Sequence, residues 1–399
     1  MYNTDENTPP SELENRINNL KIELEKNKTD AALILQKADL FYFAGTVQQS
    51  HLYVPVDGQP LLMVHKTFDR ALAETNLQNV LPLQTPKQIP DFLQAYGLRK
   101  PAILGMELDV IPVNMFDSYR QIFESVKIVD ISNTIRHVRA VKSAYEIDII
   151  QKAADFSDQV ADSVNEFLRE GISEIEFAGL VEARARKLGH QGILRMRLWG
   201  GEMFYGHIMA GPAAAVPSYL SSPTGGSAIS PAVAQGSSFR PINRNEPVLV
   251  DYVFAYKGYL SDHTRIFAIG GISDELLTAH QAMLDVQALV KKEAKPGIKA
   301  GDVYQLAVSK AAELGYADNF MGFGEERINF IGHGVGIEID EYPFLSKGQA
   351  LELREGMIIA LEPKLIFPGI GVVGIENTHV VTKQGLKQFG HFSEEINIV

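Results

Sequence analysis

Four carboxylates and one histidine in the C-terminal half of the chain are of the types that could do chemistry together. Two of the carboxylates, Asp251 and Asp262, lie in apolar runs that meet at Lys257-Gly258. Apolar, β-branched runs around a two-residue loop predict a β-hairpin. In that hairpin Val253 faces Asp262, so Asp251 and Asp262 are diagonal neighbours on one side, about 7–8 Å apart at the backbone. Their side chains can converge.

The other two carboxylates, Glu362 and Glu376, lie in a second predicted hairpin. A three-residue loop, Pro368-Gly369-Ile370, places Glu362 directly opposite Glu376. Like charges that face each other on a sheet are destabilising. Between the two hairpins His333 lies in a glycine-rich turn, Gly332-His333-Gly334, which can bring the imidazole close to other backbone. The acidic pairs on apolar ribbons therefore indicate a bound cation.

This donor set suits a pair of divalent metal ions. Oxygen-rich ligation with one imidazole favours manganese, cobalt, iron or zinc over thiolate-bound copper. Two such ions about 3.5–4 Å apart form a hydrolytic site in which a carbonyl is polarised. Each carboxylate taken alone is more often a solvated side chain than a ligand. The prediction of two metal ions therefore depends on the five residues together.

The sequence around these five residues resembles the motifs of the M24 metallopeptidases, which include methionine aminopeptidase, prolidase and aminopeptidase P. The matching segments are Ser261-Asp262-His263-Thr264-Arg265, Gly332-His333-Gly334-Val335-Gly336-Ile337-Glu338, Leu361-Glu362-Pro363 and Ile375-Glu376-Asn377-Thr378. The resemblance implies that the two metal ions are held by Asp251, Asp262, His333, Glu362 and Glu376. It also implies a C-terminal pita-bread fold and a role for Glu362 as the acceptor of a proton from the attacking water.

Three further residues are predicted to support the site. Thr264 lies opposite Asp251 in the predicted register, where it can steady a ligand. His207, four residues before Gly211, is expected to reach the pocket as a catalytic residue, and the alternative is a structural histidine in a strand. Asp340 is expected to act as a protonated donor beside the other carboxylates or to contact a substrate amino terminus. A solvated or ion-paired edge is the alternative for Asp340.

The sequence departs from the resembled family at three histidine positions, which are Ser218, Asn329 and Asp340 here. This departure motivates an alternative function, a catalytically altered or silent protein that binds peptide or another amide. An amidinohydrolase like creatinase is disfavoured because the full ligand set is present. The Ser/Gly/Pro-rich segment 218–240 is longer than the family usually has there. It is interpreted as a lid or specificity element, with a passive surface loop as the alternative.

The composition sets the broad class. The chain has 399 residues, 45% of them hydrophobic and 22% charged, which is typical of a soluble globular protein. The absence of a long apolar run excludes a predicted membrane span. There are no cysteines, so disulfides and thiolate sites are excluded. The net charge of −12 argues against nucleic-acid binding. A polar N-terminus without signal-peptide features favours a cytoplasmic location.

The remaining pattern predicts a two-domain α/β (α+β) protein. After a disordered tail of about ten residues, the first domain (1–139) is predicted to hold strands at 31–35, 41–45, 51–56, 61–64 and 101–105, with helices at 12–26, 68–74 and 90–96. In the second domain (140–399) helices are predicted at 144–170, 173–188, 278–293 and 302–314. The first domain resembles the N-terminal domain of creatinase and prolidase. The resemblance implies a homodimer and an exopeptidase that cleaves the N-terminal bond of short peptides, with Xaa-Pro substrates expected.

Overall fold

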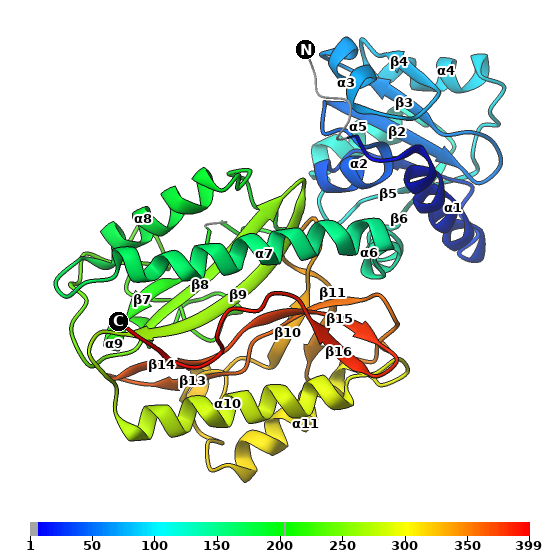
Figure 1. The fold of residues 1–399 in the computed structure, drawn as a ribbon. Helices are drawn as coiled ribbons and strands as arrows, with labels where there is room; N and C mark the ends of the chain where they lie inside the picture. The colour runs from blue at the N-terminus through cyan, green and yellow to red at the C-terminus, as the bar shows by residue number, and fades with distance from the viewer. Residues whose placement is uncertain (1–6, 203–204) are drawn as a thin grey trace. The chain divides into compact units, whose positions relative to one another are not determined.

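The computed structural model describes residues 7–202 and 205–399, and Figure 1 shows it as a ribbon. The chain divides into two compact units, Met1–Arg139 and Ala140–Val399. Most of the predicted N-terminal tail lies outside the described residues. Helix α1 (Pro10–Lys26) begins at Pro10, where a missing N–H costs nothing. Its apolar face is buried, as the spacing of Leu13, Ile17, Leu20 and Leu24 predicts.

The N-terminal unit is a mixed sheet with helices, in the strand order β4-β3-β2-β1-β5-β6. Its strands are β1 (Ala31–Ile34), β2 (Ser50–Pro55), β3 (Leu61–Val64), β4 (Val80–Pro82), β5 (Ile103–Met106) and β6 (Lys127–Asp130). After α1 its helices are α2 (Lys37–Ala44), α3 (Phe68–Glu74), the short η2 (Pro86–Gln88), α4 (Ile89–Ala95), α5 (Val113–Ile122) and α6 (Ser132–Ala140), which ends one residue into the next unit.

The predicted strand at 41–45 is wrong, because these residues belong to helix α2. The side chain of Gln36 accepts the Asp39 N–H at the start of the helix, and Gly45 ends it with a φ of 73°. A short apolar run such as Phe41-Tyr42-Phe43 has no periodicity that separates a buried strand from a buried helix. The residues that favour a helix here are Gln36 at the start of α2 and Gly45 at its end.

A buried histidine makes the stability of this unit dependent on pH. His51 Nε2 lies 2.6 Å from Tyr119 Oη, and burial, with a smaller contribution from His65, lowers the pKa of His51 to about 4. A folded-state pKa below the unfolded value of 6.5 means that the unfolded chain binds the proton more tightly. His51 therefore contributes stability above pH 6.5, and this contribution is lost as the pH falls towards 4.

We expect His51 to account for a loss of about 2 kcal/mol in the free energy of unfolding between pH 7 and pH 5. The measurement is urea unfolding, followed by circular dichroism, of the wild type and of His51→Gln at both pH values. The variant should lose less stability than the wild type on acidification. His391→Gln, at an exposed histidine, is the control and should behave like the wild type. Equal losses in all three proteins would contradict the prediction.

The C-terminal unit begins with helices placed by their caps. Ser143 and Glu146 form the predicted capping box at the start of α7 (Ala144–Phe167), and Ser173 caps α8 (Glu174–Lys187). These helices pack on a sheet with the order β17-β9-β8-β7. Its strands are β7 (Ile208–Ala210), β8 (Val248–Tyr256), β9 (Tyr259–Ala268) and β17 (Asn397–Ile398), and the short α9 (Gly211–Ala214) follows β7.

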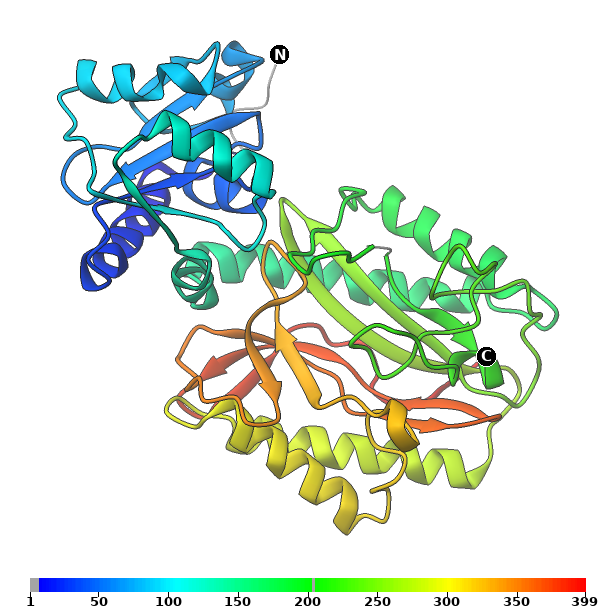
Figure 2. The same cartoon turned by 180° about the vertical axis from the view of Figure 1, so that it is seen from behind.

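A second sheet of this unit has the order β11-β10-β12-β15-β16, and β13 pairs with β14 beside it. These strands are β10 (Phe330–Gly334), β11 (Glu341–Ser346), β12 (Ile358–Leu361), β13 (Lys364–Phe367), β14 (Gly371–Gly374), β15 (Asn377–Thr382) and β16 (Gly385–Gln388). Helices α10 (Asp274–Glu293) and α11 (Ala300–Glu313) cover them, with the short η3 (Gly324–Glu326) after α11. Figure 2, seen from behind, shows the strands of this unit between α7/α8 and α10/α11.

The second hairpin has the predicted register but is divided between two sheets. Leu361 pairs with Asn377 in one sheet and Lys364 pairs with Gly374 in the other, so the register is continuous across the break. The break falls at Pro363, which has no N–H for a ladder hydrogen bond. Glu362 and Glu376 lie at this junction, where their backbone N–H groups donate to Ile331 and Thr264 instead. Glu362 and Glu376 thus lie opposite each other at the break between the two sheets.

Candidate metal centre and active site

The first hairpin brings two carboxylates together as its register predicts. Asp251 pairs with Thr264, Val253 with Asp262 and Tyr256 with Tyr259. Neighbouring hydroxyls tie this ribbon to the second sheet. The Asp262 N–H donates to Thr378 Oγ1 (2.8 Å), and Thr264 Oγ1 donates to Glu376 Oε2 (2.9 Å). Thr264, which is not itself a predicted ligand, therefore orients the Glu376 carboxylate.

Glycines on either side of His333 allow its strand to approach two neighbours. A Cβ at Gly332 would lie 2.4 Å from the Ala360 carbonyl oxygen, and one at Gly334 would lie 2.2 Å from the Tyr342 carbonyl oxygen. Both obstacles are backbone atoms, so a larger side chain could not be accommodated by a rotamer change. The glycines therefore let β10 lie close enough to carry the imidazole into the cluster.

His333 lies beside three of the four carboxylates. Its Nε2 atom is 3.9 Å from Asp262 Oδ2, 3.8 Å from Glu362 Oε1 and 4.0 Å from Glu376 Oε1. Ligand atoms of Asp262, His333 and Glu376 all lie within 4.8 Å of one another. These separations suit ligands around a shared ion about 2.0–2.2 Å from each donor atom.

Lys364, which the sequence reasoning missed, lies inside the same cluster. Its Nζ atom donates to Glu376 Oε2 (2.8 Å), Glu362 Oε2 (2.9 Å) and Asp251 Oδ2 (3.1 Å), and its side chain is 1% exposed. The signal was available, because side chains two positions apart on extended backbone point to the same side. Lys364 follows Glu362 by two residues.

Burial and mutual repulsion change the proton affinity of this cluster. Burial, together with Glu376 and Asp251, raises the pKa of Asp262 well above its ordinary value despite the opposing Lys364. Burial raises the pKa of Glu376 to about 8, opposed by Lys364 and reinforced by Glu362 and Asp251. For Lys364, burial alone would lower the pKa, but the attraction of three carboxylates raises it. Lys364 alone therefore does not offset the burial and mutual repulsion of these carboxylates, and a further positive charge beside them would be favourable.

A buried carboxylate oxygen without a hydrogen-bond partner in the described part of the chain indicates that these residues can hold a divalent ion. Asp262 Oδ1 is buried and has no hydrogen-bond partner among the described residues. A buried carboxylate oxygen without a partner is costly unless it coordinates a metal. Oxygen and imidazole donors together suit manganese, cobalt, zinc or iron. Asp262, His333 and Glu376, whose ligand atoms lie close together, are among the predicted ligands that would hold such an ion.

The cluster lies in a cavity of about 630 Å³. The five predicted ligands line it together with the predicted catalytic residues His207 and Asp340. His207 is buried, which lowers its pKa, and its Nε2 atom lies 3.0 Å from Gln235 Oε1. Gln235 and residues 220–222 bring the 218–240 segment into the cavity wall. This contribution favours the specificity element over the passive surface loop.

The geometry gives Asp340 a positioning role. Its Oδ1 and Oδ2 atoms accept the backbone N–H groups of Arg197 and Leu198, both at 2.9 Å. These two bonds hold the 197–198 segment beside the cavity, which Leu198 lines, and the catalytic role of Asp340 stays a prediction. Of the other two departures, Asn329 lines the cavity, and Ser218 lies outside the described lining.

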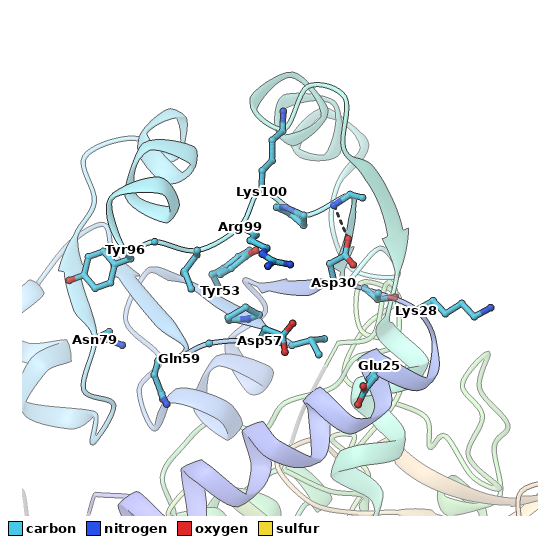
Figure 3. Close-up of a pocket in the computed structure, with 18 residues that line it drawn as sticks. Glu25, Lys28, Asp30, Tyr53, Asp57, Gln59, Asn79, Tyr96, Arg99 and Lys100 are labelled. Atoms are coloured by element: carbon cyan, nitrogen blue, oxygen red, sulfur yellow. Dashed lines mark hydrogen bonds between the residues drawn. The ribbon is translucent and has the colours of Figure 1, made fainter.

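A separate hollow in the N-terminal unit is shown in Figure 3. It is open and carries charged side chains of both signs, including Asp30, Asp57 and Lys100. Asp30 Oδ2 accepts the backbone N–H groups of Ala102 and Ile103, so this carboxylate secures the start of β5. None of the five predicted ligands is among the described residues that line this hollow.

Comparison with known proteins places the chain in a family. Residues 148–383, more than half of the chain, match the model of metallopeptidase family M24. The chain belongs to this family. Residues 16–141 match the creatinase/prolidase N-terminal domain. As an M24 member the chain is a metal-dependent peptidase, which agrees with the donor set. The predicted family is confirmed, as is the predicted fold class of a creatinase-like domain followed by a pita-bread domain.

Relatives of this M24 chain cover nearly its whole length. The Xaa-Pro dipeptidase of Pyrococcus horikoshii is 28% identical over 378 residues, covering 94% of this chain and 96% of the relative. The crystal structure of the prolidase from Pyrococcus horikoshii matches with a TM-score of 0.78 and 26% identity, covering 95% of this chain and 99% of that one. An Xaa-Pro dipeptidase from Bacillus anthracis shares the fold, with a TM-score of 0.82, 23% identity and coverage of 97% and 100%.

No helix of the described residues is both long and apolar enough to cross a membrane.

Proposed function

We propose that this chain is an exopeptidase that releases the N-terminal residue of short peptides, with Xaa-Pro peptides as its main substrates. The observation that carries the proposal is the convergence of Asp251, Asp262, His333, Glu362 and Glu376 in one cavity. Relatives named Xaa-Pro dipeptidase, similar over almost the full length, supply the substrate class. Oligomeric state and location stay predictions, a homodimer in the cytoplasm.

The residues around the cavity would have different roles in peptide hydrolysis. A bound divalent ion supplies Lewis-acid polarisation of the scissile carbonyl. Lys364 holds Glu362 Oε2 at 2.9 Å, so the Glu362 carboxylate is fixed in the cavity wall, where it would accept the proton of the attacking water. Apolar side chains, among them Met196, Phe330 and Phe344, line the wall that would take an apolar side chain or a proline ring.

The predicted ions are manganese, cobalt, zinc or iron, and the predicted number is two. The number depends on Lys364, because its ammonium group contacts three of the five ligands. The alternative function, a catalytically altered or silent protein that binds peptide or another amide substrate, is motivated by Ser218, Asn329 and Asp340. The intact ligand set disfavours it.

The test is to remove metal from the purified protein and add back Mn²⁺, Co²⁺, Zn²⁺, Fe²⁺ or none. Cleavage of a panel of Xaa-Pro and non-Pro di- and tripeptides is then followed by mass spectrometry, with the same peptides blocked at the N-terminus as controls. We expect metal-dependent loss of one N-terminal residue, fastest before proline and absent from blocked peptides. Metal binding without cleavage of any peptide would contradict the proposed function and favour the alternative of a catalytically altered or silent protein.

A further inference from the structure

Lys364 divides the oxygens of the cluster into two sets. The first set, Asp262 Oδ2, Glu362 Oε1 and Glu376 Oε1, lies 3.8–4.0 Å from His333 Nε2. The second set, Asp251 Oδ2, Glu362 Oε2 and Glu376 Oε2, lies 2.8–3.1 Å from Lys364 Nζ. Glu362 and Glu376 therefore turn one oxygen to each side. The cluster has two positions for positive charge, and the chain itself fills one of them.

The ammonium group is fully engaged in its position. A lysine has three N–H donors, and each has a carboxylate within 3.1 Å. A divalent ion on the same oxygens, with a bond length of about 2.0–2.2 Å, would lie at most about 5 Å from Nζ. Two buried cations that compete for the same lone pairs at that separation repel each other. The first set is different, because His333 offers an imidazole there. The other oxygen of Asp262, Oδ1, is buried without a partner among the described residues, so this carboxylate still lacks a cation.

We propose that Lys364 takes the place of one of the two cations, so that this chain binds a single divalent metal ion among Asp262, His333, Glu362 and Glu376. Asp251 then serves as an anchor for the lysine. Lys364 is a positioning residue here, since it holds Glu362 and Glu376 with one oxygen each towards the ion. The inference rests on the proposed function in that it specifies the metal content of the same site.

The experiment counts metal ions and does not depend on turnover. Wild type, Lys364→Ala and Lys142→Ala are saturated with Mn²⁺, freed of loosely bound ions, and analysed by mass spectrometry of the metal and by electron paramagnetic resonance. Lys142 is a matched control, because it is a buried lysine that is paired with Glu341 (2.9 Å) and lies outside the described cavity lining. Circular dichroism checks the fold of each protein.

We expect one ion per chain in the wild type and in Lys142→Ala, with the spectrum of isolated Mn²⁺. Lys364→Ala should bind two ions and show the spectrum of a spin-coupled manganese pair. Two ions in the wild type would overturn the inference, and so would one ion in both the wild type and a folded Lys364→Ala. If Lys364→Ala does not fold, the wild-type count and spectrum decide alone.

Peptide cleavage by the same wild-type samples separates the two claims. Cleavage with two bound ions would overturn the single-ion inference and leave the proposed function standing. One bound ion without cleavage of any peptide would support the inference and contradict the proposed function. A wild type that binds no ion would overturn both.

Discussion

Glu362→Gln should lower kcat for the best Xaa-Pro peptide by a factor of about 10²–10⁴, the range that a positioned general base contributes. The substitution keeps one side-chain oxygen but removes the group that can accept a proton from the attacking water. Glu362 is 5% exposed and lies in the cavity, so the change leaves the surface charge of the protein almost unaffected. Steady-state kinetics at saturating Mn²⁺ provide the measurement.

The matched control is Glu325→Gln, which makes the same chemical change at an exposed position in η3, outside the described cavity lining. It should leave kcat unchanged. Metal content must be determined for both variants. Loss of a metal ligand would lower the metal content, whereas loss of the base alone would lower kcat with the metal still bound. A folded, metal-loaded Glu362→Gln protein with the wild-type kcat would show that another residue accepts the proton.

His333→Ala should weaken metal binding by more than about 100-fold. Even the residues that merely orient metal ligands typically contribute 10- to 100-fold to affinity, and His333 is the imidazole of the donor set. The remaining donors are carboxylate oxygens, so discrimination in favour of zinc and cobalt over magnesium should also fall. Competition with a fluorescent chelator measures both effects.

His391→Ala serves as the control for His333→Ala, because this histidine is exposed and lies outside the described cavity lining. Its metal affinity should equal that of the wild type. The Gly332 and Gly334 backbone is unchanged in His333→Ala, so β10 should keep its place between β11 and β12 and thermal unfolding without metal should change little. Unaltered metal affinity in His333→Ala would exclude the imidazole from the donor set.

The sequence alone determined the local geometry of the two hairpins. Register in a hairpin follows from loop length, so Lys257-Gly258 and Pro368-Gly369-Ile370 were sufficient to align Asp251 with Thr264 and Leu361 with Asn377. The capping box of Ser143 and Glu146 likewise located the start of α7. These features depend on residues a few positions apart, whose interactions the chain order already fixes.

Only the tertiary structure decided which distant groups share the cavity. The Gln235 contact with His207 and the hold of Asp340 on the Arg197 and Leu198 backbone join segments with no common sequence signal. Lys364 was predictable in part. Strand alternation places its side chain on the same side as Glu362, whereas its distance to Asp251 depends on how the two hairpins pack against each other. Long-range packing sets such separations, and a few ångströms decide whether an ammonium group or a metal ion neutralises a buried carboxylate.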